Sequence, residues 1–253
     1  MPVLRFNLAM LRFTATFLAV PIFLIATLQG EGPVGAAKDA AKGEAKTLTF
    51  KEDSSWKPSH FGGDGPIEMK DGVLSLGFGD PFTGVRWEGE FPKINYEISL
   101  EARRVGGFDF FCGLTLPVAD QRVSLILGGW GGSLIGLSSI DGLDASNNET
   151  MLIRDFEKAR WYKVKVRVTD KKITVWLDNE EIITVDREGR VFDIRSEMEE
   201  STPMGVSAFQ SEAEIRNLVV KTLAPNEEAK DSGGSKDSGG TKEASTEGKA
   251  TPK

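Results

Sequence analysis

The residue types best suited to ligand binding gather in one glycine-rich segment, residues 128–150, which reads GGWGGSLIGLSSIDGLDASNNET. Glycines on both sides of Trp130 allow the backbone to approach a ligand and leave the indole ring exposed. A flat aromatic ring that stacks on a pyranose face is a common way to hold a sugar. Trp130 is therefore a candidate saccharide contact. The alternative is a glycine-rich turn capped by a packed tryptophan.

Polar side chains follow Trp130 in the same segment, and their oxygen atoms can bind a ligand. These residues are Asp141, Asp144, Asn147, Asn148 and Glu149. Such oxygens can accept hydrogen bonds from sugar hydroxyls or coordinate Ca²⁺. The spacing is not that of an EF-hand loop, and an ordinary surface turn also explains it. Asp141, Asn147 and Asn148 are therefore candidate ligand-binding residues, and calcium is the one cofactor that the segment suggests.

Hydrolysis of a glycosidic bond needs two carboxylates that flank the bond, about 5–10 Å apart. Asp109 together with Asp141 or Glu149 could supply such a pair. Their spacing does not distinguish them from other acidic residues, namely Asp53, Asp80 and Glu88. Asp109, Asp141 and Glu149 are thus candidate catalytic groups that no motif supports.

The histidine and cysteine content limits other kinds of catalysis. His60 is the only histidine, so a Ser-His-Asp triad would have to use it. It could act as a general base, but a loop histidine without a nearby acidic partner is usually polar surface. Cys112 is the only cysteine, so no intrachain disulfide forms. Its place in an alternating apolar stretch predicts a small buried hydrophobic residue rather than a reactive thiol.

The overall charge argues against a nucleic-acid partner. The chain of 253 residues has a formal net charge of -7 and a pI near 5.0. A surface that binds phosphates needs a surplus of lysine and arginine to displace counterions. We therefore expect no nucleic acid among the partners of this protein.

The element around which the chain is organised is a predicted three-stranded antiparallel meander over residues 160–186. In its first strand Tyr162, Val164 and Val166 alternate with lysine and arginine, which is the period of a half-buried strand. Polar turns at residues 170–172 and 178–179 separate it from two further alternating stretches. One face of the meander is predicted to be core and the other to face water.

Strand signals recur every 8–12 residues along the middle of the chain, as in an all-β sandwich. Besides the meander, the predicted strands lie at residues 47–51, 67–69, 73–78, 84–88, 95–104, 108–115, 122–127, 134–138, 151–154, 204–209 and 213–223. Little helix is expected, so no element could cover a parallel sheet. The pattern therefore predicts an all-β fold, an antiparallel two-sheet jelly-roll sandwich.

A curved sheet in such a sandwich can hold a ligand on its concave outer face. Arg86, Asp109 and Arg122 fall on the polar sides of their strands, so we expect them to join a saccharide-binding surface. A solvated sheet face explains them equally well. Trp176 lies opposite the apolar residues of its strand, and is either exposed or covered on that outer face. In the strand at residues 108–115, Phe108 and Phe110 are predicted to face the core with Cys112.

Both ends of the chain look non-globular. Residues 1–30 read as a secretory signal, with Arg5 and Arg12 before an apolar run; an uncleaved membrane anchor is the alternative. Residues 31–46 read as a linker and residues 224–253 as a disordered mixed-charge tail. The sandwich is predicted to occupy residues 47–223. The protein is expected to be secreted, periplasmic or on the cell surface, with membrane contact only through an uncleaved N-terminal segment.

Three segments of the sandwich resemble the concanavalin A-like (laminin G-like) fold. They are a strand that begins at Trp161, a segment from Ile173 to Asn179 that fits I-T-hydrophobic-W-hydrophobic-D/N-G except at its last position, and a closing P-hydrophobic-G and I-R-N pattern between Pro203 and Asn217. Within this fold, the chain is similar to the bacterial 3-keto-disaccharide hydrolase-like family over residues 47–223. That family shows an N-S-G-hydrophobic segment ending in arginine where this chain has FFCGLT at residues 110–115. The resemblance therefore implies saccharide chemistry but assigns no catalytic residue.

Three functions are consistent with these observations. The first is an exported carbohydrate-binding module whose partner is a saccharide or a cell-surface polysaccharide. The second, implied by the resemblance, is a glycoside hydrolase that acts on 3-keto or related modified disaccharides. The third is a structural or adhesion module without catalytic activity.

Overall fold

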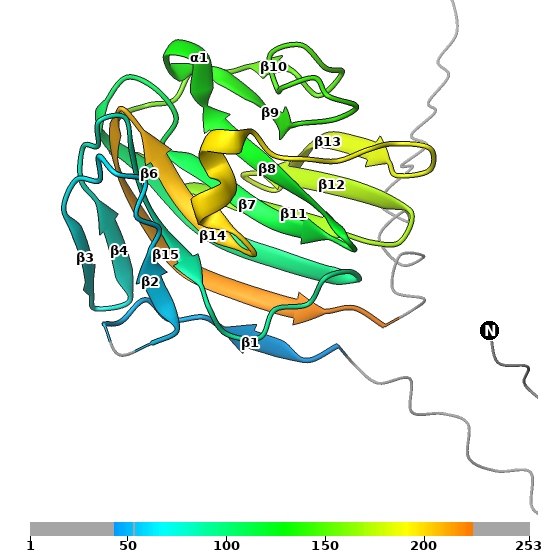
Figure 1. Cartoon of the computed structure of the whole chain (residues 1–253), viewed down its shortest axis with the longest axis horizontal. Coiled ribbons are helices and arrows are strands. Elements are labelled where there is room, and N and C mark those ends of the chain that lie inside the picture. The colour runs from blue at the N-terminus through cyan, green and yellow to red at the C-terminus, as the bar shows by residue number, and fades with distance from the viewer. Residues whose placement is uncertain (1–42, 53, 225–253) are drawn as a thin grey trace, which may run out of the picture. The chain divides into compact units, whose positions relative to one another are not determined.

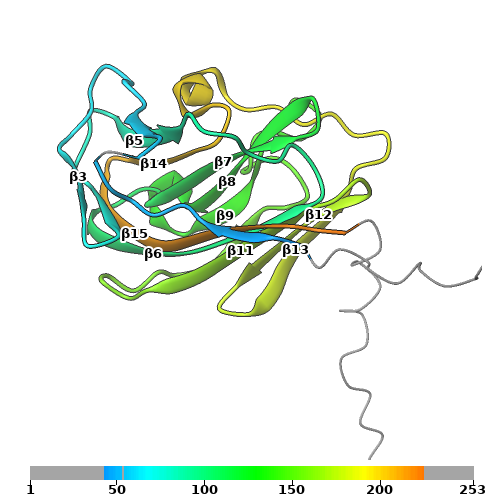
Figure 2. The ribbon, with the colours of Figure 1, turned by 90° about the horizontal axis from the view of Figure 1, so that it is seen from below.

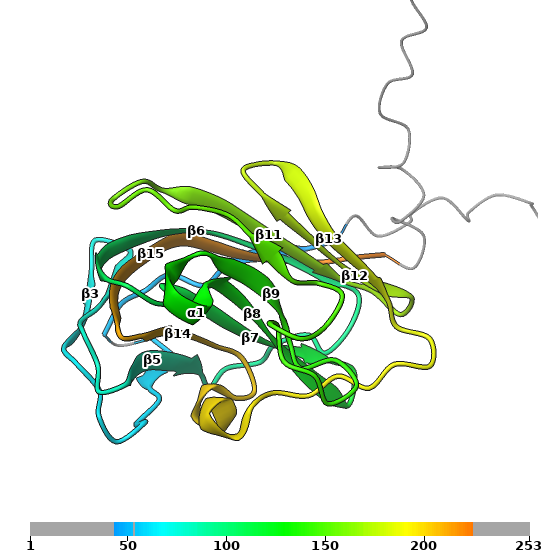
Figure 3. The ribbon, with the colours of Figure 1, turned by 90° about the horizontal axis from the view of Figure 1, so that it is seen from above.

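The computed structural model describes residues 43–52 and 54–224 (Figure 1). The predicted signal or anchor segment, most of the predicted linker and nearly all of the predicted tail lie outside these residues. Two antiparallel β-sheets pack face to face in the described part, which confirms the predicted jelly-roll sandwich (Figures 2 and 3). No helix among the described residues is long and apolar enough to cross a membrane.

One sheet contains eight strands in the order β13-β12-β11-β6-β15-β4-β3, with β1 paired to β15. Its strands are β1 (Ala45–Thr47), β3 (Ile67–Lys70), β4 (Val73–Leu76), β6 (Tyr96–Gly107), β11 (Tyr162–Val168), β12 (Lys172–Leu177), β13 (Glu180–Asp186) and β15 (Ser211–Thr222). The three strands of the meander predicted at residues 160–186 are β11, β12 and β13 of this sheet. The long strands β6 and β15 pair in the middle of the sheet and join its two halves.

The other sheet contains seven strands in the order β10-β9-β8-β7-β14-β5-β2. Its strands are β2 (Trp56–Pro58), β5 (Phe82–Trp87), β7 (Cys112–Val118), β8 (Gln121–Gly128), β9 (Leu134–Ser138), β10 (Leu152–Ile153) and β14 (Gly205–Phe209). Strand β2, which the sequence analysis missed, contributes the buried Trp56 at one edge. Two short segments accompany this sheet, the turn labelled α1 (Gly129–Gly132), which contains non-helical backbone at Trp130 and Gly131, and the 3-10 helix η1 (Ser196–Ser201).

The main core lies between the sheets and follows the predicted alternation. Ile98 and Leu100 of β6 and Val166 of β11 are buried in one cluster with Leu114 of β7 and Leu125 of β8. Each of these strands therefore places every second side chain in the core. Cys112 is also buried in this cluster, as predicted.

The predicted strand at residues 108–115 was wrong in its first half. Strand β6 runs on to Gly107, a turn occupies residues 108–111, and β7 begins only at Cys112. The turn breaks the alternation, since Phe111 and Cys112 are adjacent and both lie in the core, and within it the carboxylate of Asp109 accepts a hydrogen bond from the N–H of Phe110 at 2.8 Å. Phe108 is consequently 56% exposed, and Phe111 instead enters the core. Phe110 packs in a second, smaller hydrophobic cluster outside the core.

Candidate functional site

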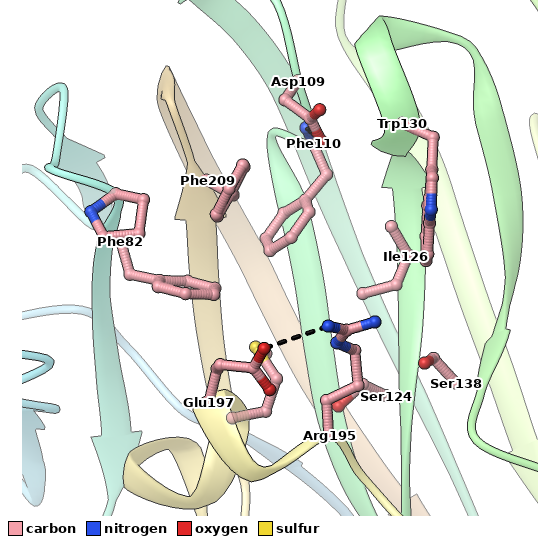
Figure 4. Close-up of a pocket in the computed structure, with 12 residues that line it drawn as sticks. Phe82, Asp109, Phe110, Ser124, Ile126, Trp130, Ser138, Arg195, Glu197 and Phe209 are labelled. Carbon is pink, nitrogen blue, oxygen red and sulfur yellow. Dashed lines mark hydrogen bonds and ion pairs between the residues drawn. The ribbon is translucent and has the colours of Figure 1, made fainter. Parts of the chain in front are cut away.

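The outer face of the seven-stranded sheet holds a pocket of ≈ 320 Å³. Figure 4 shows the side chains that line it, which come from β5, β8, β9, β14, the turn before β7, α1 and the segment around η1. Ile126 of β8 and Phe209 of β14 point into it, since their neighbours Leu125 and Ala208 face the core on the other side of the sheet. The pocket is therefore separate from the main core.

Three phenylalanines form one wall of the pocket. The ring centroids of Phe82 and Phe209 lie 4.9 Å apart, and those of Phe110 and Phe209 lie 5.7 Å apart. Gly113 makes room for this packing, because a Cβ there would lie 2.9 Å from the ring of Phe110. The wall is thus a continuous apolar surface on the outer face of the sheet.

Trp130 lies on the opposite side of the pocket (Figure 4). Its backbone has φ 49 and ψ 51, the left-handed conformation that bulky residues rarely adopt. Its side chain is 44% exposed although it is large and apolar. Backbone strain of this kind costs conformational free energy, and strained residues occur often at binding sites. The strain at Trp130 therefore supports a binding role for its exposed ring.

Arg104 and Asp109 hold the turn that carries Trp130. Arg104 Nη2 donates hydrogen bonds to the carbonyl oxygens of Asp109, Gly128 and Gly132 at 3.1, 3.3 and 2.8 Å. Asp109 Oδ2 accepts a hydrogen bond from the N–H of Gly131 at 2.9 Å. Burial lowers the pKa of Arg104, and the nearby Asp109 opposes this effect. Arg104 of β6 and Asp109 of the turn after β6 therefore hold the backbone on both sides of Trp130.

The segment that includes η1 forms the remaining charged rim of the pocket. Arg195 and Glu197 line the pocket, and Arg195 Nη2 lies 3.0 Å from Glu197 Oε1. The hydrogen bond from Arg195 lowers the pKa of Glu197. Arg195 Nη1 also lies 3.2 Å from the carboxylate of Asp144. Met198 of η1 is buried against the phenylalanine wall, which anchors the rim to the sheet.

Two serines lie at the floor of the pocket, on neighbouring strands. Ser124 of β8 pairs in register with Ser138 of β9. Ser124 Oγ lies 2.9 Å from Thr115 Oγ1 and shares a hydrogen bond with it. The floor therefore offers hydroxyl groups between an aromatic wall and a charged rim.

Of the candidate residues from the sequence, Asp109 and Trp130 line this pocket and the others lie elsewhere. Arg86 forms an ion pair with Glu88 at 2.9 Å and donates to the carbonyl oxygen of Ser59. Arg122 forms an ion pair with Glu199 at 2.9 Å. Both arginines lie on the seven-stranded sheet but outside the pocket lining.

The candidates of the acidic loop are occupied by contacts within the loop and with nearby arginines. Arg190 bonds Asp141 at 2.6 Å and Glu149 at 2.5 Å. A hydrogen bond from the N–H of Val191, followed by that from Arg190, lowers the pKa of Asp141. Asn147 donates to the carboxylate of Asp144 at 2.8 Å.

Asn148 is buried, and its side chain holds the loop together through hydrogen bonds. Its Nδ2 donates to the carbonyl oxygens of Leu137, Leu143 and Asp144, and its Oδ1 accepts from the hydroxyl of Thr150. The described residues contain no group of three or more histidine, cysteine, aspartate or glutamate side chains that could hold a metal ion. Calcium binding by the loop stays a prediction.

Trp176 and His60 both lie outside the pocket lining. Trp176 is on the outer face of the eight-stranded sheet, where Lys165 Nζ lies 4.0 Å from the centre of its ring. His60 is exposed in the loop after β2, with φ 62. Neither residue shares a surface with Asp109 in the pocket.

The site residues that come from distant strands and from η1 were not predicted from the sequence. Glu197 lies in η1, a short 3-10 helix between β13 and β14. The local signal was Met198, a large apolar residue among charged neighbours, whose burial brings Glu197 to the pocket. Ser138 and Phe209 carried no local signal at all.

Comparison with known proteins identifies the family. The sequence model of the 3-keto-alpha-glucoside-1,2-lyase-like domain matches residues 48–221, so the chain belongs to this family and the resemblance noted from its motifs is confirmed. A search of curated proteins finds no match to this chain.

Several solved structures are similar to this one at low sequence identity. The carbohydrate binding module CBM66 from Bacillus subtilis is 10% identical, with a TM-score of 0.47 over 67% of this chain and 96% of that chain. The Crh5 transglycosylase in complex with NAG is 11% identical, with a TM-score of 0.49 over 73% of this chain and 85% of that chain. A prokaryotic beta-1,3-1,4-glucanase (lichenase) from a mouse hindgut metagenome is 11% identical, with a TM-score of 0.42 over 72% of this chain and 99% of that chain.

Proposed function

We propose that the protein binds a saccharide in the pocket on the outer face of the seven-stranded sheet. The observation that carries the proposal is the composition of the pocket, with the exposed ring of Trp130 facing a phenylalanine wall and with hydroxyl and charged groups between them. Aromatic faces pack against the C–H groups of a sugar ring, while polar side chains bond its hydroxyls. The volume of ≈ 320 Å³ is at the low end of the roughly 300–1,000 Å³ of small-ligand sites, which suits a short saccharide.

Membership of a lyase-like family makes an enzyme the second candidate. A 1,2-lyase acting on a 3-keto-glucoside removes the proton at C2 and forms a C1–C2 double bond. The C1–O bond breaks, and the leaving oxygen takes up a proton. The observation that favours this reading is that two carboxylates, Asp109 and Glu197, line one pocket. Binding remains the first proposal because both carboxylates are already engaged, Asp109 by two backbone N–H groups and Glu197 by Arg195 at 3.0 Å.

Binding is tested by isothermal titration calorimetry of the full chain against a panel of glucosides and 3-keto-glucosides. Trp130→Ala is expected to weaken the tightest ligand about tenfold or more, because it removes one aromatic face. Trp161→Ala is the matched control, since Trp161 lies between Arg103 and Arg216, outside the pocket lining. Unchanged affinity in Trp130→Ala, or binding of no glycoside, would overturn the proposal.

Catalysis is tested by following release of the leaving alcohol from 3-keto-α-glucosides. Glu197→Gln removes the charge of the rim carboxylate without changing its size, and Glu199→Gln changes a neighbouring glutamate of η1 that pairs with Arg122. Turnover by the wild type that falls at least a hundredfold in Glu197→Gln alone would replace the binding proposal by the enzyme. Equal turnover in both variants would exclude Glu197 as the acid or base.

Export is part of the same proposal. Arg5 and Arg12 precede an apolar run at residues 13–28, which supports a secretory signal. Expression of the full gene followed by mass spectrometry of the periplasmic and medium fractions tests this. A chain that has lost about thirty N-terminal residues is expected in those fractions, and an intact chain confined to the cytoplasm would contradict it.

A further inference from the structure

A buried hydroxyl group at the floor of the pocket has no partner. Ser138, the last residue of β9, is 1% exposed, and its Oγ makes no hydrogen bond within the described residues. Buried polar groups are nearly always paired, because an unpaired one loses its hydrogen bonds to water without replacement. Ser138 lines the pocket, and Figure 4 shows its oxygen directed toward the space beside Arg195. The floor thus holds an unused hydrogen-bonding group.

The neighbouring serine shows that this is not a general property of the sheet face. Ser124 sits directly across from Ser138 in the β8–β9 register and lines the same pocket. Its hydroxyl is paired with that of Thr115 at 2.9 Å. Of two adjacent buried serines, therefore, one is satisfied by the protein and one is left for a group that enters the pocket.

The charges around the pocket favour an uncharged ligand. Among the described residues that line it, Asp109 and Glu197 are acidic and Arg195 is the one cation. Arg195 is already bonded to Glu197 and to Asp144, at 3.0 and 3.2 Å. Arg195, Glu197 and Asp144 together carry a net charge of about -1, and Asp109 is balanced by the nearby Arg104, so an acidic ligand would meet a rim with a negative excess.

We propose that Ser138 bonds one hydroxyl group of an uncharged saccharide at the pocket floor, and that Asp109 and Glu197 exclude acidic saccharides. This inference rests on the proposed function, because it assigns the ligand class of the same pocket. Ser138 can either donate or accept this hydrogen bond. Its oxygen has almost no accessible surface in the free protein, so this bond requires the Ser138 hydroxyl to turn about χ1 toward the ligand group that enters the pocket.

The test uses calorimetry of the full chain with the methyl glycosides of glucose, galactose, mannose and N-acetylglucosamine. The tightest of them is then compared with its single-deoxy analogues and with the matching methyl uronoside. One deoxy analogue is expected to bind wild type about three- to tenfold more weakly than its parent. Ser138→Ala should have an affinity for the parent glycoside that is lower than that of wild type by the same factor. It should bind the parent and that analogue with equal affinity. The uronoside should bind at least about tenfold more weakly than the neutral sugar.

Thermal unfolding of the free protein separates binding from folding. Ser138→Ala is expected to raise the melting temperature, because it removes a buried polar group without a partner. Ser124→Ala should lower it, because the hydroxyl of Thr115 loses its partner. Ser59→Ala removes another buried, unpaired hydroxyl that lies outside the pocket lining, and should raise the melting temperature with no change in affinity.

The outcomes distinguish this inference from the proposed function. If Ser138→Ala binds the neutral glycoside as tightly as wild type does, the role of Ser138 is overturned. The same holds if Ser138→Ala loses affinity by the same factor for the parent and for every deoxy analogue. A uronoside that binds as tightly as the neutral sugar would overturn the exclusion of acidic ligands. If no glycoside binds the wild type, the proposed function itself fails and this inference fails with it.

Discussion

The carboxylate of Asp109 accepts a hydrogen bond from the backbone N–H of Gly131, with 2.9 Å between Oδ2 and N. This bond joins the turn before β7 to the turn after β8, and Trp130 is the residue immediately before its donor. The other oxygen of Asp109 accepts from the N–H of Phe110 at 2.8 Å. One carboxylate therefore positions an aromatic group on each side of the pocket, Phe110 and Trp130. Asp109 has this structural role whatever chemistry the pocket performs.

Replacement of Asp109 should consequently disturb both sides of the pocket. Asp109→Ala leaves two backbone N–H groups without an acceptor, and we expect it to lower the free energy of unfolding by about 1–3 kcal/mol. Urea denaturation measures this change, and acrylamide quenching of tryptophan fluorescence reports on the order of Trp130. Asp120→Ala, in the exposed turn between β7 and β8, is the control and should stay within about 0.5 kcal/mol of wild type. Equal stability of the two variants would contradict the positioning role.

Arg104 should contribute strongly to the stability of the fold, because it holds the turn that carries Trp130. Its Nη2 donates hydrogen bonds to the carbonyl oxygens of Asp109, Gly128 and Gly132. Its guanidinium lies 5.2 Å from the ring centre of Phe111. Arg104→Met keeps the apolar stem but leaves the carbonyl groups unpaired. We expect a loss of about 2–4 kcal/mol in the free energy of unfolding and weaker saccharide binding.

A lysine at the same position is a sharper version of this test. Arg104→Lys retains the charge but lacks the planar fork that reaches several carbonyl oxygens at once. It is expected to recover only part of the lost stability. Full recovery of stability and of affinity would show that charge alone, rather than the arrangement of hydrogen bonds, holds the Trp130 turn.

The fold could be predicted from local patterns because apolar and polar residues alternate along each strand, which shows which of its faces is buried. Val164 and Val166 alternate with lysines along β11, and this period of two fixes both the strand and its orientation. The alternation failed at Phe108, where apolar residues continue at the same period through a turn. There β6 ends at Gly107 and β7 begins only at Cys112, and these bounds are set by the pairing of the strands in the folded sheets.

The site could be predicted only where the chain breaks a local rule. Trp130 stood out because a tryptophan among four glycines is unusual, and the structure does place it at the pocket. Ser138 and Glu197 could not be found in the same way, since their importance depends on strands and a 3-10 helix that meet only in the folded sheet. The unpaired state of Ser138 is visible only once every neighbour has been placed.

Cys112 should be chemically inert in the native protein. Burial raises the pKa of its thiol to about 12, so at pH 8 roughly one molecule in ten thousand carries the reactive thiolate. We expect no alkylation by iodoacetamide at pH 8 under native conditions and complete alkylation in concentrated guanidinium chloride. Because Cys112 is the only cysteine, mass spectrometry of the intact protein reports on this site alone. Modification at the rate of a free thiol would show that β7 opens readily.

The ion pair of the pocket rim should make stability depend on pH in a defined direction. The hydrogen bond from Arg195, which lies 3.0 Å away, lowers the pKa of Glu197 in the folded state below the value of about 4.3 in an unfolded chain. The folded state therefore binds fewer protons than the unfolded state between these two values. The stabilisation is complete above about pH 4.3 and is lost as the pH falls through the lower, folded-state pKa.

The difference in melting temperature between wild type and Glu197→Gln should follow the same course. It is expected to be largest near neutral pH and to shrink steadily as the pH falls from about 5 to 3. Salt at about 0.5 M should reduce it at neutral pH, because the Arg195 side chain is 47% exposed and the pair is screened. Glu200→Gln, which removes a carboxylate of η1 that forms no ion pair within the described residues, should give a difference near zero throughout. If Asp144 destabilised the carboxylate instead, Glu197→Gln would melt above wild type at neutral pH, and this opposite difference would vanish as the pH falls.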